Sequence, residues 1–129
     1  MTILDANAIL RYLLKDIPEQ SQRTKEVIQN GATTNPEILA EVVYVLKGVY
    51  DLERSDISLS LKTLLSEIQC KEKAVVLFAL DLYSEKPSLD FIDCLLCGYK
   101  AKHNASILTF DKALLKELER LSAPFTEQN

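Results

Sequence analysis

Along most of the chain, apolar residues recur at the three- and four-residue spacing that is typical of amphipathic helices. Helix ends are marked as well: Asn35-Pro36 joins a capping side chain to the residue favoured in a first turn. Asp5 and Asn7 are candidate caps for the first helix, and Ser55 or Asp56 is expected to cap the fourth. The pattern predicts helices over 7–15, 18–30, 36 to about 48, 55–68, 78–85, 90–103 and 111–121.

Short β-rich runs separate these helices and predict strands over 2–4, 31–34, 74–77 and 106–109. Strands of this kind, alternating with longer helices, are typical of parallel strands that helices cover on both faces. We therefore expect an α/β fold in three layers, with a short, mostly parallel central sheet flanked by helices. The element order is βααβααβααβα or close to it.

Length and composition favour one ordinary globular domain spanning residues 1–129. No apolar run approaches the roughly 20 residues that cross a bilayer, and no signal peptide is visible, so we expect a cytoplasmic protein without a membrane segment. The three cysteines are expected to be free thiols. The polar end of the chain, 123–129, is expected to fray.

Two acidic residues directly follow predicted strands. Asp5 comes after the first strand and Asp111 after the fourth. Functional crevices of open parallel sheets lie beyond the carboxyl ends of their strands, so the two carboxylates could share one crevice. For each of them, capping of the next helix is the structural alternative.

Two further acids lie within predicted helices. At about 100° per residue, Glu41 falls at the margin of the apolar stripe of its helix, where either a cleft ligand or a surface glutamate fits. Asp93 is the third residue of its helix if Asp90 is the N-cap, a position where an acid suits the helix dipole. Taken singly, neither acid establishes a site.

Taken together, four segments around these acids resemble the PIN-domain family, and within it the VapC-type toxins of toxin–antitoxin pairs. The segments match in family order: a first strand with a "D-x-N" turn, a glutamate helix, a "D-F-x-D" helix start and a closing "T-F-D" turn. They cover residues 4–14, 35–46, 90–96 and 107–112. Ala6 replaces a frequent threonine and Cys94 a frequent alanine, and neither is a ligand position.

The resemblance implies a PIN-like three-layer sandwich that binds Mg²⁺ or Mn²⁺ and hydrolyses RNA phosphodiester bonds. Asp5 and Asp93 would be the main ligands, Glu41 and Asp111 would complete the site, and Asn7 would orient Asp5. Carboxylates without histidine suit hard divalent ions, which supports this choice of metal independently. The resemblance also implies an antitoxin partner and a homodimer.

Net charge bears on the same question. The chain carries −4, with 15 Lys and Arg against 19 Asp and Glu, which disfavours non-specific binding of nucleic acid. If four acids hold a metal ion, the remaining charges balance, so the objection to a nuclease weakens. Lys100, Lys102 and Arg11 are candidates to guide a phosphate backbone, although most surface cations are simply solvated.

Other readings of the chain have less support. A non-catalytic interaction domain, whose acids only cap helices, is the main alternative, and metal binding discriminates the two. Cys94-Leu95-Leu96-Cys97 has C-x-x-C spacing but lies in an apolar helix, which favours buried, inert thiols over zinc. The lone His103 sits near a helix end, and a Ser-His-Asp hydrolase or a phosphate-accepting receiver fits poorly. The identity of the RNA stays open.

Overall fold

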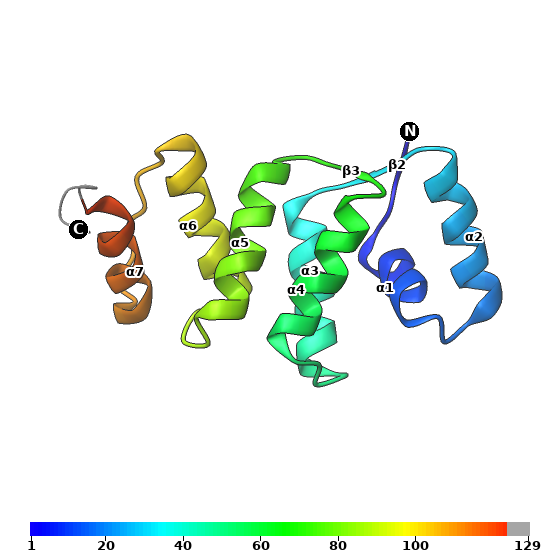
Figure 1. Ribbon diagram of the computed structural model, residues 1–129, viewed down its shortest axis with the longest axis horizontal. Coiled ribbons are helices and arrows are strands. Elements are labelled where there is room, and N and C mark those ends of the chain that lie inside the picture. Colours follow the sequence, from blue (N-terminus) through cyan, green and yellow to red (C-terminus); the bar gives the residue numbers. More distant parts are fainter. Residues whose placement is uncertain (124–129) are drawn as a thin grey trace. The chain divides into compact units, whose positions relative to one another are not determined.

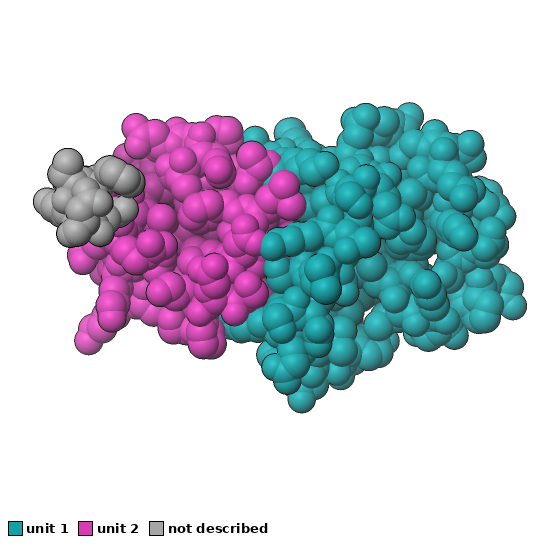
Figure 2. Space-filling model, in the orientation of Figure 1, with its two compact units in different colours: residues 1–73 teal, residues 74–129 magenta. Residues whose placement is uncertain are grey.

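The computed structural model of the protein describes residues 1–123, so the expected fraying at 124–129 falls outside the described residues. The chain divides into two compact units, Met1–Lys73 (unit 1) and Ala74–Asn129 (unit 2), which Figure 2 colours teal and magenta. Each unit is described by itself below.

Unit 1 contains a three-stranded parallel sheet. Its strands are β1 (Thr2–Ile3), β2 (Ala32–Thr34) and β3 (Gln69–Cys70), in that spatial order. Thr2 pairs with Ala32 and Thr33 with Gln69, both in parallel register. The predicted parallel sheet and its first two strands are thus confirmed.

Pairs of helices make the two crossovers that parallel strands require. Helices α1 (Ala6–Leu14) and α2 (Pro18–Gln29) join β1 to β2, and α3 (Pro36–Gly48) and α4 (Arg54–Leu65) join β2 to β3 (Figure 1). Helix α1 packs against both α2 and α3, and α3 packs against α4. The fully buried side chains of this unit include Ile9, Leu39, Leu46, Ile57 and Leu61.

Capping was predicted correctly for two of these helices and wrongly for one. Asp5 Oδ1 accepts a hydrogen bond from the Ala8 amide at 2.8 Å, and Asn35 Oδ1 accepts one from the Ile38 amide at 3.0 Å. Helix α4 begins earlier than expected, after Glu53, without a side-chain cap. Ile57 and Ser58 are buried in the first turns of this helix, so packing stabilises its start in place of a capping side chain.

Unit 2 is helical in its described part, and here the predicted strand over 74–77 is wrong. These residues form the first turns of α5 (Lys73–Glu85). Val75, Val76, Ala79 and Leu80 are all fully buried, a helical spacing, whereas a short apolar run alone does not distinguish a strand from a buried helix. The third strand of the sheet is Gln69–Cys70 instead.

The other helices of unit 2 are α6 (Phe91–His103) and α7 (Lys112–Ser122), close to the predicted ranges. The predicted strand over 106–109 is wrong: these residues link α6 to α7 without pairing. A strand needs a second strand to pair with, and the described residues of unit 2 contain no strand that could pair with 106–109. Leu108 and Phe110 are therefore 87% and 89% exposed.

None of the helices formed by residues 1–123 combines the length and the hydropathy that crossing a bilayer requires.

Candidate metal centre

Asp5 and Glu41 line the same hollow in unit 1, which has a volume of about 300 Å³. Asp5 stands between β1 and α1, and Glu41 lies in the middle of α3. Ala6, Asn7 and Leu10 of α1 complete much of the wall. Packing of α1 against α3 therefore brings two carboxylates that are far apart in the sequence to one opening.

The sheet fixes the backbone that precedes Asp5. Leu4 is 4% exposed, and its amide donates a hydrogen bond to the carbonyl of Thr33 at 2.9 Å. Thr34 Oγ1 donates to the Leu4 carbonyl at 3.4 Å. Because one carboxylate oxygen of Asp5 caps α1, the other oxygen is left for a ligand, so capping and metal binding are compatible at this residue.

Glu41 is positioned by the burial of its own helix. Leu39, Val42 and Val43, beside it in the sequence, are at most 3% exposed and anchor α3 in the core. Glu41 itself is exposed, at the rim that the periodicity predicted. A carboxylate there reaches the hollow without the cost of burying a charge.

In unit 2, Asp93 and Asp111 both stand at helix N-termini. Asp90 caps α6, its Oδ1 accepting a hydrogen bond from the Asp93 amide at 2.8 Å. Asp111 caps α7, accepting from the Leu114 amide at 2.8 Å, while its own amide donates to Thr109 Oγ1 at 3.1 Å. The helix starts expected at Asp90 and Asp111 are confirmed.

These acids of unit 2 repel one another. Partial burial raises the pKa of Asp93, and the negative charges of Asp90 and Asp111 raise it further. A cation close to Asp93 would favour the ionised carboxylate and so lower this pKa again. Asp90 thus contributes charge to this cluster, a role that the sequence pattern, which marked it only as a cap, did not reveal.

Each unit supplies two of the four predicted ligands. Asp5 meets Glu41 at one hollow, and Asp93 interacts electrostatically with Asp111. Among residues 1–123, no three His, Cys, Asp or Glu side chains gather closely enough to hold a metal ion by themselves. All the donors are carboxylates, which fits a hard divalent ion such as Mg²⁺ or Mn²⁺.

Asn7, the remaining predicted site residue, lines the hollow beside Asp5. No hydrogen bond joins the side chains of Asn7 and Asp5. Asp5 Oδ1 accepts from the Ala8 amide instead. The exposed amide of Asn7 nevertheless lies at the same opening as the carboxylates of Asp5 and Glu41.

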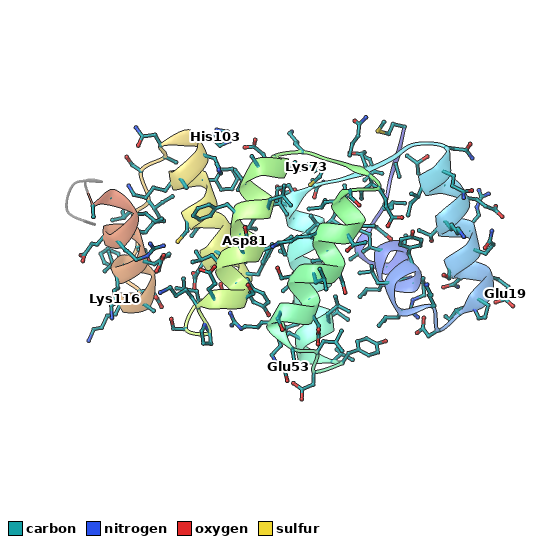
Figure 3. The ribbon with its side chains drawn as sticks, in the orientation of Figure 1. Glu19, Glu53, Lys73, Asp81, His103 and Lys116 are labelled. Carbon is teal, nitrogen blue, oxygen red and sulfur yellow. The ribbon has the colours of Figure 1, made fainter. Side chains whose placement is uncertain are left out.

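The cysteines and the histidine lie as expected. All three cysteines are free, and Cys94 and Cys97 are buried in α6. Burial, the largest cause, raises the pKa of the Cys97 thiol to about 11, which keeps it protonated and unreactive at neutral pH. His103 is the last residue of α6 (Figure 3).

Residues 2–121 match the model of the PIN domain family. The match spans nearly the whole chain, so the protein belongs to the PIN domain family. Its seven described helices and three-stranded parallel sheet fit the α/β sandwich of that family. PIN domains have a nuclease-type fold and are generally metal-dependent ribonucleases. Neither a curated protein nor a solved structure matches the chain.

Proposed function

We propose that this protein is an endoribonuclease that depends on Mg²⁺ or Mn²⁺. Asp5, Glu41, Asp93 and Asp111 would bind the metal, with Asp5 and Asp93 as the main ligands. The observation that carries the proposal is the meeting of Asp5 and Glu41 at one hollow of unit 1. Family membership supports the same reaction.

The four carboxylates suit this role chemically. Each offers at least one oxygen, and none competes with a nitrogen or sulfur ligand that would favour zinc. When bound, the divalent ion would lower the pKa of a coordinated water and offset charge on the phosphodiester. Asn7 would orient Asp5 once the site is loaded, as outer partners of metal ligands commonly do.

The catalytic domain would comprise residues 1–129 as one whole. The family match runs from residue 2 to 121 and so includes both compact units, which supports a shared activity. All four acids lie within the matched residues, which supports assigning them to one activity.

We further propose a biological setting for the nuclease. It would be the toxin of a toxin–antitoxin pair, act in the cytoplasm as a homodimer and be held inactive by an antitoxin protein. The "D-x-N" turn, glutamate helix, "D-F-x-D" start and "T-F-D" turn, which together resemble VapC-type toxins, support this setting.

The test is calorimetric titration of Mn²⁺ into the wild type and Asp5→Asn, with an RNA cleavage assay on the same samples. We expect the variant to lose metal binding and cleavage together, by at least about 100-fold. Asp51→Asn is the matched control, because Asp51 is an exposed aspartate of the same unit, outside the hollow. Cleavage that survives in Asp5→Asn, or a wild type that neither binds Mn²⁺ nor cuts RNA, would contradict the proposal.

A further inference from the structure

A second hollow of unit 1, with a volume of about 340 Å³, lies where α1 meets α2. It shares Asp5 and Asn7 with the hollow described above. Beyond them its lining includes Arg11, Gln20 and Arg23. The two hollows therefore meet at the start of α1. The first has carboxylates as its only charged groups, whereas the second adds two guanidinium groups to the carboxylates of Asp5 and Glu19.

Arg23 brings an uncompensated positive charge to this hollow. It is exposed on α2 and makes no ion pair in the part of the chain that the structure describes. Glu19, one helical turn earlier and labelled in Figure 3, also lines the hollow but lies beyond ion-pair distance of Arg23. The guanidinium is left available to an anion from solution.

Arg11, unlike Arg23, forms an ion pair within the protein. Its Nη1 lies 2.9 Å from Oδ2 of Asp16, and its side chain is only 15% exposed. Its Nε is buried and has no hydrogen-bond partner among the described residues. Buried donors are normally paired, so an acceptor at this wall would complete the hydrogen bonding of Arg11 after a small side-chain shift.

Another basic hollow, in unit 2, makes a useful contrast. It is lined by Lys86, Lys116 and Arg120, but also by Glu117, which is 6% exposed. Glu117 accepts from Arg120 Nε at 2.8 Å and lies 4.0 Å from Lys86 Nζ. Glu117 thus pairs with two of the three cations of that hollow, whereas Arg23 has no ion pair in the described part of the chain.

From these observations we infer that the Arg11–Arg23 hollow binds the phosphate backbone of single-stranded RNA next to the bond that is cut. The guanidinium fork matches phosphate oxygens, and the amides of Asn7 and Gln20 suit a ribose hydroxyl. Arg11 and Arg23 are positioning residues that hold the strand while the carboxylates act. This inference rests on the proposed ribonuclease function.

Arg23→Gln is the direct test, with Lys25→Gln as control because it removes the same charge from an exposed position of the same helix. Binding is measured with labelled, mixed-sequence single-stranded RNA in chelator, over a series of salt concentrations. We expect Arg23→Gln to bind about tenfold more weakly. The slope of log affinity against log salt should fall by about 0.7, because the variant neutralises one phosphate fewer on a single strand.

Cleavage in Mn²⁺ gives the second measurement. Arg23→Gln should raise KM with little change in kcat, and its Mn²⁺ affinity should equal that of the wild type. Arg11→Lys, which keeps the charge but removes the fork, should weaken RNA binding while leaving the salt slope nearly unchanged.

The outcomes separate this inference from the function on which it rests. A wild type that cuts RNA, with Arg23→Gln indistinguishable from Lys25→Gln in affinity and salt slope, would overturn the inference alone. A wild type that neither binds nor cuts RNA would overturn both. A fall in affinity and slope confined to Arg23→Gln would support the inference.

Discussion

In unit 1 the candidate ligand Asp5 directly follows a strand of the parallel sheet, whereas in unit 2 the candidates Asp93 and Asp111 stand at the first turns of helices. The backbone before Asp5 is tied to β2 through Leu4, so its direction is set by strand pairing. The acids of unit 2 depend on local capping hydrogen bonds, and partial burial, together with the negative charges of Asp90 and Asp111, raises the pKa of Asp93. The sheet supplies a rigid position, and the helix ends supply concentrated negative charge.

The first prediction asks whether Glu41 and Asp111, the partners of Asp5 and Asp93, contribute equally to metal binding and cleavage. Glu41→Gln and Asp111→Asn should each weaken Mn²⁺ affinity and RNA cleavage by about 10–100-fold, because each removes a charged oxygen ligand or its water-mediated equivalent. Calorimetry and cleavage on the same samples measure this. Glu37→Gln, an exposed glutamate of the same helix as Glu41, is the control and should behave as the wild type. Full activity in Glu41→Gln would restrict the site to aspartates.

The packing of the two units also differs at their helical glycines. A Cβ at Gly98 of α6 would lie 2.8 Å from the carbonyl oxygen of Val75 and 3.0 Å from its Cγ1, so α5 and α6 meet there closely. Gly98→Ala should destabilise the protein by about 1–3 kcal/mol. A Cβ at Gly48 of α3 meets nothing within 4 Å, and Gly48→Ala should stabilise it by about 0.5–1 kcal/mol.

Urea denaturation followed by circular dichroism measures both glycine variants. Equal stability of Gly98→Ala and the wild type would mean that α5 and α6 are not packed as closely as the structure has them. A loss of stability in Gly48→Ala would mean that the end of α3 is less open than it is here.

The smallest expected effect concerns a hydrogen bond of unit 1 that joins α1 to the segment after α4. Tyr12 Oη donates to Glu67 Oε2 at 2.7 Å, and this bond, with burial, raises the pKa of Tyr12 from 10.0 to about 12. Because the pKa of Tyr12 is higher in the folded chain than in the unfolded one, this interaction contributes its full stability below pH 10. That contribution is lost as the pH rises towards 12. Tyr12→Phe should cost about 0.5 kcal/mol at neutral pH, because the bond is exposed.

Ultraviolet titration of tyrosinate gives the measurement. One tyrosine of the wild type should ionise about two pH units later than an ordinary one, and Tyr12→Phe should lack that late step. A titration of the wild type without a late step would show that the bond to Glu67 does not persist in solution.

Much of the fold was predictable because helices carry local signals. Asn35-Pro36 and Asp90 mark helix starts through side chains that reach only three residues ahead, and both starts are where the sequence predicts them. Strands are defined by partners elsewhere in the chain. The run at 74–77 therefore resembles a strand although its buried residues follow helical spacing, and 106–109 has no pairing partner among the described residues of its unit.

The site was predictable in part for the same reason. The motifs identified Asp5, Glu41, Asp93 and Asp111 as candidates, and Asp5 and Glu41 do meet at one hollow. The hollow that contains Arg23 depends on packing of α1 against α2, which no local pattern specifies. The charge that Asp90 adds to Asp93 likewise emerges only from side-chain placement.

The central claim is the proposal that Asp5 and Asp93 are the main metal ligands of a ribonuclease, and a double-variant cycle tests it most directly. Mn²⁺ affinity and RNA cleavage would be measured for Asp5→Asn, Asp93→Asn and the two combined. If both acids are required ligands, each single variant loses at least about 100-fold in Mn²⁺ affinity and in cleavage, and the combined variant is hardly worse, because residues that act as a unit are not additive. Losses that multiply in the combined variant, or metal binding that survives in Asp93→Asn, would contradict the claim.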